Sequence, residues 1–224
     1  MVAFDLDGTL AITKSPLSAT IADLFSRALD LFEMCVISGG SFHQFETQVL
    51  GPRHLGEARA TRLHLMPTSG TRYYRYETAA SAWVQQYAED LSDTDKSRAV
   101  AALRQAAEEL GLWEQKPTGD VIEDCGSQIT FSALGQRAPP DPKYRWDPDG
   151  VKKEALRRAV AQLLPDLEVR AGGTTSIDIT RHGIDKAYGI RHTAYASSWM
   201  SSTSVPLTLS FSVTSSTSAE TTTP

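Results

Sequence analysis

A short apolar run, Val2 to Leu6, ends in the turn Asp7-Gly8-Thr9, and this feature most restricts how the chain can fold. A helical stretch follows, with Pro16 near its start and apolar residues close to the helical period. A second apolar run, Met34 to Ile37, ends in Ser38-Gly39-Gly40. Strand, helix and strand, with a polar or glycine-rich turn after each strand, predict a parallel α/β sheet. Ligands gather at the carboxyl ends of such strands, and both turns fall there.

The middle of the chain predicts an α+β unit inserted into this first domain. Leu63 to Met66 and Thr71 to Tyr76 flank a Ser69-Gly70 turn and predict a hairpin. The patterns beyond it predict helices over Thr78–Leu91 and Thr94–Leu110, a strand over Gln128–Leu134, a helix from Asp147 to Leu164, and strands over Leu167–Arg170 and Thr175–Thr180. We therefore expect an α/β fold with three parts: a Rossmann-like parallel-sheet core of residues 1–70 and 181–192, an inserted α+β cap of residues 71–180, and a tail of residues 193–224.

Composition and charge exclude several classes of protein. A chain of 224 residues suits one large domain, or one ordinary domain with a smaller one. The net charge of −5 gives no broad basic surface for nucleic acid or an anionic membrane. Cys35 and Cys125 lack metal-ligand spacing, and neither an N-terminal targeting signal nor a bilayer-length apolar run is present. We expect a cytoplasmic protein with a small-molecule partner, and its oligomeric state stays open.

Asp5 and Asp7 are the first candidates for chemistry. Two carboxylates at i and i+2, where a strand ends, reach one pocket once Gly8 turns the chain. One carboxylate can attack phosphorus and form an aspartyl-phosphate, and the other can move the proton of the leaving oxygen. A pair this close needs a cation, and its hard oxygen donors suit Mg²⁺. A bare Asp-x-Asp is usually a capping turn, but the whole string Phe4 to Leu10 favours catalysis.

This string resembles the first motif of the haloacid dehalogenase superfamily of phosphatases and phosphomutases. The resemblance implies that Asp5 is the nucleophile, that Asp7 is the general acid/base, and that both contact Mg²⁺. Ser38 matches the second motif and would bind a phosphoryl oxygen, with Gly39 beside it at the substrate. Lys186 matches the third motif, a lysine that offsets the charge of the nucleophile and the phosphoryl group. An insert between Ser38 and Lys186 is the layout of the subgroup with a large α/β cap, which includes sugar-phosphate phosphatases.

The predicted cap is similar to the cap of the phosphomannomutases in that subgroup. Ser127 to Gly135 resembles one of their cap strands, and Gly172 to Asp178 resembles the last one. Ser176 and Asp178 then match positions that contact substrate. The similarity covers most of residues 1–191.

Two departures from the phosphomannomutase pattern concern charge. Where those enzymes place arginines that grip the distal phosphate, this chain has Cys125 and Gln136. Arg137, a further candidate for substrate binding, is out of register by one residue. Neither a cysteine nor a glutamine supplies a bidentate cationic fork. The pattern therefore favours a phosphatase that acts on a monophosphate over a mutase.

The fourth family motif, which supplies carboxylates to Mg²⁺, is missing after Lys186. Residues 191–224 contain no Asp, and more than half of residues 193–224 are Ser or Thr. Our hypothesis is a frameshift after about Ile190, because the codons from Ser212 to Pro224, read in a shifted frame, permit Gly-Asp-x-x-x-x-Gly-Gly-Asn-Asp-Tyr-Pro. A natural disordered tail is the alternative. We expect the tail to be disordered or misformed, with weak metal binding, little turnover and an exposed sheet edge.

Three functions stay open at this point. The first is an Mg²⁺-dependent phosphatase that forms an aspartyl-phosphate on a small phosphorylated metabolite of the sugar-phosphate type. The second is a phosphomannomutase-like enzyme, which strict dependence on a bisphosphate activator would reveal. The third is a truncated relic or a non-catalytic binding protein, which would bind its ligand without turnover.

Overall fold

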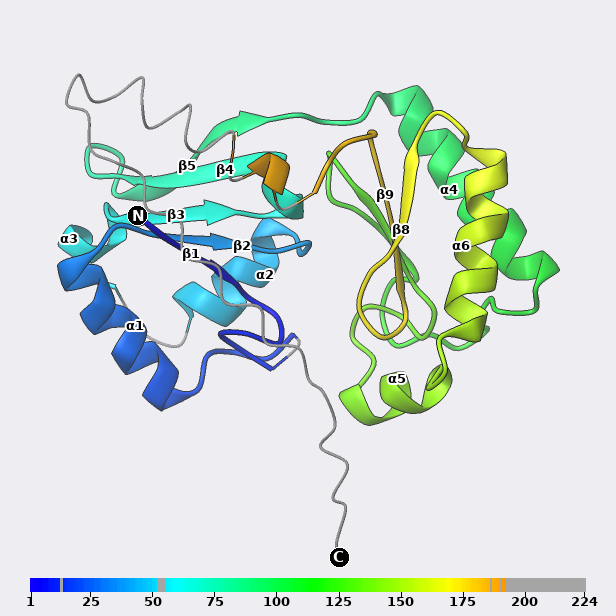
Figure 1. Ribbon diagram of the computed structural model, residues 1–224, viewed down its shortest axis with the longest axis horizontal. Helices are drawn as coiled ribbons and strands as arrows, with labels where there is room; N and C mark the ends of the chain where they lie inside the picture. The colour runs from blue at the N-terminus through cyan, green and yellow to red at the C-terminus, as the bar shows by residue number, and fades with distance from the viewer. Residues whose placement is uncertain (13, 52–54, 186, 190, 192–224) are drawn as a thin grey trace, which may run out of the picture.

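The computed structural model describes residues 1–12, 14–51, 55–185, 187–189 and 191, and it arranges them around two sheets (Figure 1). The first sheet has the strand order β1-β2-β3-β4-β5, and the second has the order β6-β7-β9-β8. This confirms the predicted α/β class. Among the described helices, none is long and apolar enough to cross a membrane. The predicted tail, residues 193–224, lies outside the described residues.

The first unit is a mixed sheet with helices on one face. Its strands are β1 (Val2–Asp5), β2 (Met34–Ile37), β3 (Leu63–Met66), β4 (Arg72–Glu77) and β5 (Ala82–Ala88). The first three run parallel, and the last two extend the sheet antiparallel. Its helices are α1 (Ala19–Leu31), α2 (Phe42–Phe45), the π-helical turn η1 (Glu46–Leu50), α3 (Glu57–Ala60) and the 3-10 turn η2 (Thr68–Gly70).

Side-chain alternation along β2 explains why the helices lie where they do. Val36 belongs to the larger apolar cluster of this unit, together with Phe25 and Leu29 of α1. Cys35 and Ile37 point to the opposite face, where the cluster is smaller. Since successive strand residues alternate between faces, one face of the sheet takes most of the helical packing. Among the described residues β1 pairs only with β2, so it lies at the edge of the sheet.

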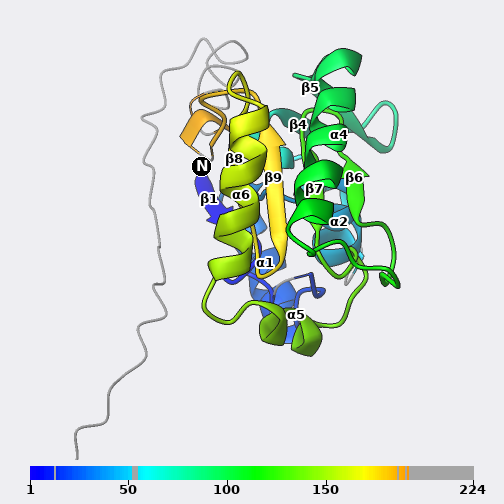
Figure 2. The ribbon, with the colours of Figure 1, turned by 90° about the vertical axis from the view of Figure 1, so that its right-hand side faces the viewer.

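The second unit is an antiparallel sheet with two long helices on its outer face, toward the viewer in Figure 2. Its strands are β6 (Ile122–Asp124), β7 (Ile129–Ser132), β8 (Glu168–Ala171) and β9 (Ser176–Thr180), and its helices are α4 (Asp93–Glu109), α5 (Pro140–Trp146) and α6 (Val151–Leu163). Ile129 and Phe131 of β7 pack with Leu103 of α4 and Leu156 of α6. The intervening residues of β7 and β9 therefore face the first unit.

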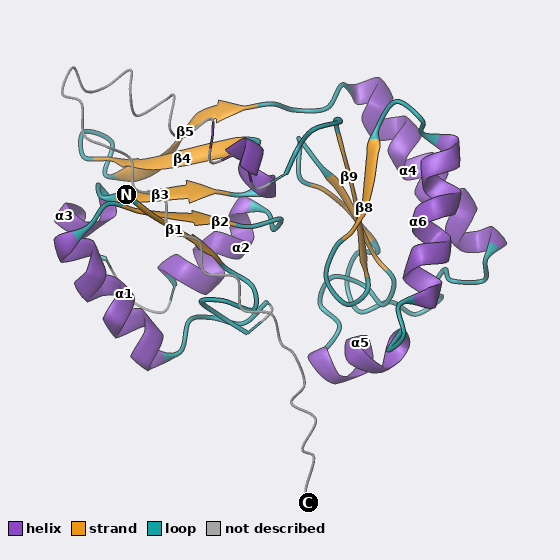
Figure 3. Ribbon diagram, viewed as in Figure 1, coloured by secondary structure: helices purple, strands orange, loops and turns teal. Residues whose placement is uncertain are grey.

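The helix predicted over Thr78–Leu91 is wrong. These residues contain a tight turn, in which Ser81 has φ +48°, followed by β5, which pairs with β4 along its length (Figure 3). Trp83 and Tyr87 favour strand, and pairing with β4 outweighs the local helix preference of the alanines beside the turn. The proposed boundary at residue 70 therefore does not separate the sheets, because β4 and β5 belong to the first one.

The chain passes between the units at two adjacent places. It leaves after β5 and returns after β9, and Arg181 donates from Nη2 to the Asp90 carbonyl at 2.7 Å, which joins the two crossings. A buried hydroxyl cluster lies nearby: Thr71 Oγ1 donates to Ser127 Oγ at 2.7 Å, and Ser127 Oγ donates to Thr68 Oγ1 at 3.0 Å. These bonds tie the second unit to η2 of the first and fix the gap between the two sheets.

Candidate active site

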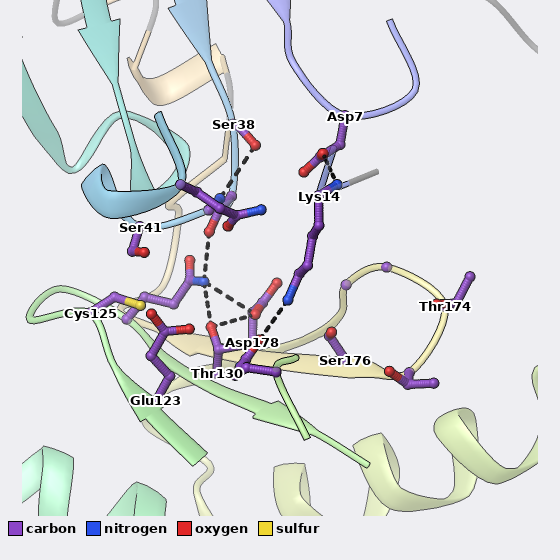
Figure 4. A pocket seen from close by; sticks show the side chains of 18 of the residues that line it. Asp7, Lys14, Ser38, Ser41, Glu123, Cys125, Thr130, Thr174, Ser176 and Asp178 are labelled. Atoms are coloured by element: carbon purple, nitrogen blue, oxygen red, sulfur yellow. Dashed lines mark hydrogen bonds between the residues drawn. The ribbon is translucent and has the colours of Figure 1, made fainter. Parts of the chain in front are cut away.

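A cavity of about 1040 Å³ lies between the two units, and it contains the carboxyl ends of β1 and β2 (Figure 4). In the parallel register Asp5 lies beside Ile37, so Asp5 and Ser38 end neighbouring strands at one edge of the sheet. Gly8, at φ +78°, turns the chain immediately after this edge. Asp5, Asp7, Ser38 and Gly39 all line the cavity. The structure thus brings these four predicted residues together.

The two carboxylates are oriented by short-range donors. Asp5 Oδ1 accepts from the Leu6 backbone N–H at 2.8 Å. Asp7 Oδ1 accepts from the Lys14 backbone N–H at 2.9 Å and from Gln48 Nε2 at 3.2 Å. Both donors to Asp7 act on the same oxygen, Oδ1. Gln48 is buried in η1, so the orientation of Asp7 depends on the helices packed under the sheet.

Ser38 is held in a loop that η2 supports. The Ser38 side chain is buried, and its Oγ accepts from the Gly40 backbone N–H at 3.3 Å. The Ser69 N–H donates to the Ser38 carbonyl at 2.8 Å, and the Thr68 N–H donates to the Gly40 carbonyl at 2.9 Å. These bonds hold the loop against η2, and residues 38–41 line the cavity.

Lys186, the candidate third-motif residue, lies outside the described residues. Its neighbours Asp185 and Ala187 both line the cavity. Asp185 Oδ1 accepts from the Tyr188 N–H at 2.7 Å, which caps the short helical turn at 187–189.

The wall opposite the carboxylates is polar, because alternate residues of β7 and β9 point into the cavity. Ser176 and Asp178 lie on this wall beside Thr130, whose hydroxyl donates to Asp178 Oδ1 at 2.8 Å. Burial raises the pKa of the Asp178 carboxyl to about 6, against the opposing hydrogen bond from Thr130. Such a wall of hydroxyl and carboxylate groups suits the hydroxyl groups of a ligand.

Two lysines that line the cavity were not singled out by the sequence. Lys14 Nζ, from the first unit, donates to Gln136 Oε1 at 2.5 Å, and Lys143 Nζ, from α5, donates to the Gln136 carbonyl at 3.1 Å. Burial and the charge of Lys14 lower the pKa of the Lys143 ammonium to about 8. Lone lysines carry no local signal, so only the fold could reveal this pair.

The remaining predicted residues border the same cavity. Arg137 is exposed beside Gln136. Cys125 is buried in the cavity wall, and burial raises the pKa of its thiol, so it stays a neutral thiol and not a nucleophile. The two positions that depart from the phosphomannomutase pattern therefore both face the cavity.

The described residues offer a partial site for a divalent cation. Asp5 and Asp7 supply carboxylate oxygens, the donors that Mg²⁺ prefers. Within the described part of the chain, no group of three or more His, Cys, Asp or Glu side chains could hold a metal ion. The residues fit an ion that keeps much of its water shell or shares its ligands with a phosphate.

Comparison with known proteins shows the fold. No protein-family model and no curated protein sequence matches the chain. The structure of Plasmodium falciparum IMP-nucleotidase matches with a TM-score of 0.58 and 12% identity, over 88% of this chain and 50% of that one. A haloacid dehalogenase-like hydrolase from Bacteroides thetaiotaomicron matches with a TM-score of 0.56 and 14% identity, over 88% and 76%. The chain has a haloacid dehalogenase-like fold. It spans about half the length of the nucleotidase.

Proposed function

We propose that the chain is built as an Mg²⁺-dependent phosphohydrolase that forms an aspartyl-phosphate on Asp5. The observation that carries this proposal is that Asp5, Asp7 and Ser38 end neighbouring strands in one cavity, opposite a hydroxyl-binding wall. The haloacid dehalogenase-like fold supports it. The substrate is a small phosphorylated metabolite of the sugar-phosphate type, bound between the two units.

Asp5 and Asp7 divide the chemistry between them. The Asp5 carboxylate attacks phosphorus and forms a new P–O bond while the ester P–O bond breaks. Asp7 gives its proton to the leaving oxygen, and it then takes a proton from the water that attacks the aspartyl-phosphate. Inorganic phosphate leaves and both carboxylates return to their starting state. Ser38 donates to a phosphoryl oxygen throughout, and Lys186 offsets the negative charge. When bound by Asp5 and Asp7, Mg²⁺ neutralises phosphoryl charge.

The cavity lining favours a sugar phosphate over a nucleotide. Among the described lining residues Tyr144 is the one aromatic side chain, and it is exposed at the rim. Asp178, Ser176 and Thr130 instead offer hydrogen-bonding partners to ring hydroxyls. A nucleobase, which gains most from stacking, would meet few partners here.

The test compares this chain with the product of the shifted reading frame. Phosphate release is measured from hexose monophosphates and nucleoside monophosphates, with Mg²⁺ and with a chelator. We expect weak Mg²⁺ binding and little turnover from this chain, and Mg²⁺-dependent turnover of hexose monophosphates from the shifted-frame product. The Asp5→Asn variant of that product should lose turnover by at least about a thousandfold, because covalent catalysis needs the carboxylate. Ordinary Mg²⁺-dependent rates from this chain would refute the frameshift account.

A second candidate function is favoured by the two lysines around Gln136. Lys14 and Lys143 bring two cations to Gln136, one of the two positions where the mutases have arginines, although Cys125 and Gln136 carry no charge. Two ammonium groups can hold a second phosphate as point charges. A phosphomannomutase-like enzyme would then require a hexose bisphosphate activator. Hexose monophosphate conversion that depends strictly on this activator, and that Lys143→Met abolishes, would establish the mutase over the phosphatase.

The third candidate, a non-catalytic binding protein, has its own signature. It would bind a hexose monophosphate stoichiometrically, with no phosphate release from either reading frame. That result would contradict the proposed hydrolase.

A further inference from the structure

Gln128 makes the one side-chain contact between Asp178 and the Ser38–Gly40 loop that the described residues record. Its side chain comes from the residue just before β7 and is 2% exposed. Its Nε2 lies 3.0 Å from the Gly39 carbonyl oxygen, 2.8 Å from Thr130 Oγ1 and 3.1 Å from Asp178 Oδ1. Figure 4 shows these contacts as dashed lines between the strands of the second unit and the Ser38–Gly40 loop.

The number of hydrogens on the Gln128 amide shows which of these contacts can be hydrogen bonds at the same time. A carboxamide has two N–H hydrogens, and three acceptors surround the Gln128 nitrogen. The Thr130 hydroxyl donates its own hydrogen to Asp178 Oδ1. Its oxygen can therefore accept weakly from a Gln128 N–H that points mainly at another acceptor. Gln128 can therefore donate to the Gly39 carbonyl and to the Asp178 carboxylate together. One amide group thus joins Gly39, which lies 89 residues from Gln128 in the chain, to Asp178, which lies 50 residues from it.

Asp178 lies between Gly39 and Gly172, and the missing side chain of Gly172 lets it come this close. A methyl group built on Gly39 would lie 4.0 Å from Asp178 Oδ2, and one built on Gly172 would lie 2.7 Å from the same oxygen. The first distance is an ordinary van der Waals contact, and the second would be a clash. The carboxylate is therefore enclosed between two backbone segments, with Gln128 donating to its other oxygen.

We propose that Gln128 is a positioning residue that holds Asp178 at a fixed distance from the phosphoryl-binding loop. The site would then select substrates by the distance between their phosphoryl group and a hydroxyl group. A substrate hydroxyl bound to Asp178 must lie at a set separation from a phosphoryl group bound at Ser38. The identity of the ligand rests on the proposed function. The contact of Gln128 with Asp178 and Gly39 is present without any ligand.

The experiment uses the full chain with Gln128→Met, which keeps the side-chain length and removes both donors. Gln105→Met is the matched control, because Gln105 is exposed on α4 and its side chain donates to Glu109, one helical turn away. Backbone hydrogen exchange is measured without ligand over residues 38–41 and 176–178. We expect exchange to rise about tenfold in both segments of Gln128→Met, in line with the loss of a hydrogen bond to a charged group, and to stay unchanged in the control.

A measurement on the unmodified chain covers the case in which Gln128→Met does not fold. The side-chain amide hydrogens of Gln128 should exchange with water far more slowly than those of Gln105. Equal exchange of the two amides, or unchanged backbone exchange in a folded Gln128→Met, would overturn the proposal.

Ligand binding then separates the two proposals. Gln128→Met should weaken the binding of a hexose monophosphate about tenfold and that of inorganic phosphate less than twofold, because only the hexose spans both sites. Equal weakening of both probes would contradict positioning by length. The two proposals can also fail separately. If the Gln128 amide hydrogens are protected but the shifted-frame product hydrolyses no phosphate ester, the contact between Asp178 and the loop stands and the proposed hydrolase is refuted.

Discussion

At the residue scale, Asp178 shows how burial makes a negative charge costly. Its side chain is partly buried at the cavity wall and receives donors from Thr130 and Gln128, yet burial still raises its pKa to about 6. Burial thus outweighs the hydrogen bond from Thr130 and the attraction of Lys14, so ionising Asp178 costs stability in the folded chain. A bound hydroxyl would supply the hydrogen bond that the charged form lacks.

Replacing Asp178 by Asn should stabilise the chain in a pH-dependent way. An acid whose pKa is raised by folding costs no stability below its unfolded pKa of 3.8, and the cost grows as pH rises through about 6. We expect Asp178→Asn to unfold with about 2 kcal/mol more free energy than the parent at pH 7.5, and with no difference at pH 3.5. Urea unfolding at the two pH values measures this. An equal effect at both would assign the gain to packing.

At the element scale, α6 shows how a loop carboxylate starts a helix. Asp147 is buried three residues before Gly150, and its oxygens accept from the N–H groups of Lys152 at 3.0 Å and Lys153 at 2.9 Å. These N–H groups belong to the first turn, which has no partners inside the helix. The predicted helix start at Asp147 therefore anticipated the cap, although the helix itself begins at Val151.

Removing this cap should weaken the second unit. We expect Asp147→Ala to lower the free energy of unfolding by about 1 kcal/mol, the usual cost of a lost side-chain cap. Asp147→Asn keeps an oxygen acceptor and should recover at least half of the loss. Urea denaturation followed by circular dichroism tests both variants. A cost for Asn as large as that for Ala would show that charge, not hydrogen bonding, matters here.

At the scale of the whole molecule, two glycines fix where the chain returns to the first sheet. Gly70 has φ +86°, and a methyl group built on it would lie 2.3 Å from the Gly189 Cα. A methyl group on Gly189 would lie 2.7 Å from Ile37 Cδ1 and 2.8 Å from the Gly70 Cα. The backbone at Gly189 therefore packs directly on η2 and β2, next to the loop that holds Ser38.

Gly189→Ala tests this close approach, because its backbone is not in the left-handed region and only packing is at stake. We expect a loss of about 1–3 kcal/mol of unfolding free energy, the usual cost of overpacking. Gly173→Ala is the control, since a methyl group there meets nothing within 4 Å. Calorimetry measures the melting temperatures of both variants, and we expect that of Gly189→Ala to be lower. Equal melting temperatures would mean that residues 187–189 can move away without cost.

The sequence alone predicted the elements whose signals are local. β1, β2 and the polar turns after them follow from short apolar runs that end in Asp, Ser and Gly, and these turns placed Asp5, Asp7 and Ser38 at one sheet edge. The apolar and polar alternation of Gln128 to Leu134 likewise predicted β7. Each of these patterns is written in neighbouring residues, where strand geometry and turn chemistry act directly.

Only the tertiary structure decided the rest. β5 took strand geometry because β4 was available to pair with it, against an alanine-rich turn that favoured helix. Lys14 reaches Gln136, and Gln128 reaches Gly39, because the second sheet packs over the first. Such contacts join residues about a hundred positions apart and leave no periodic trace in the sequence. The pattern around the proposed nucleophile is local and could therefore be read from the sequence, whereas the other wall of the cavity exists only after the two units pack together.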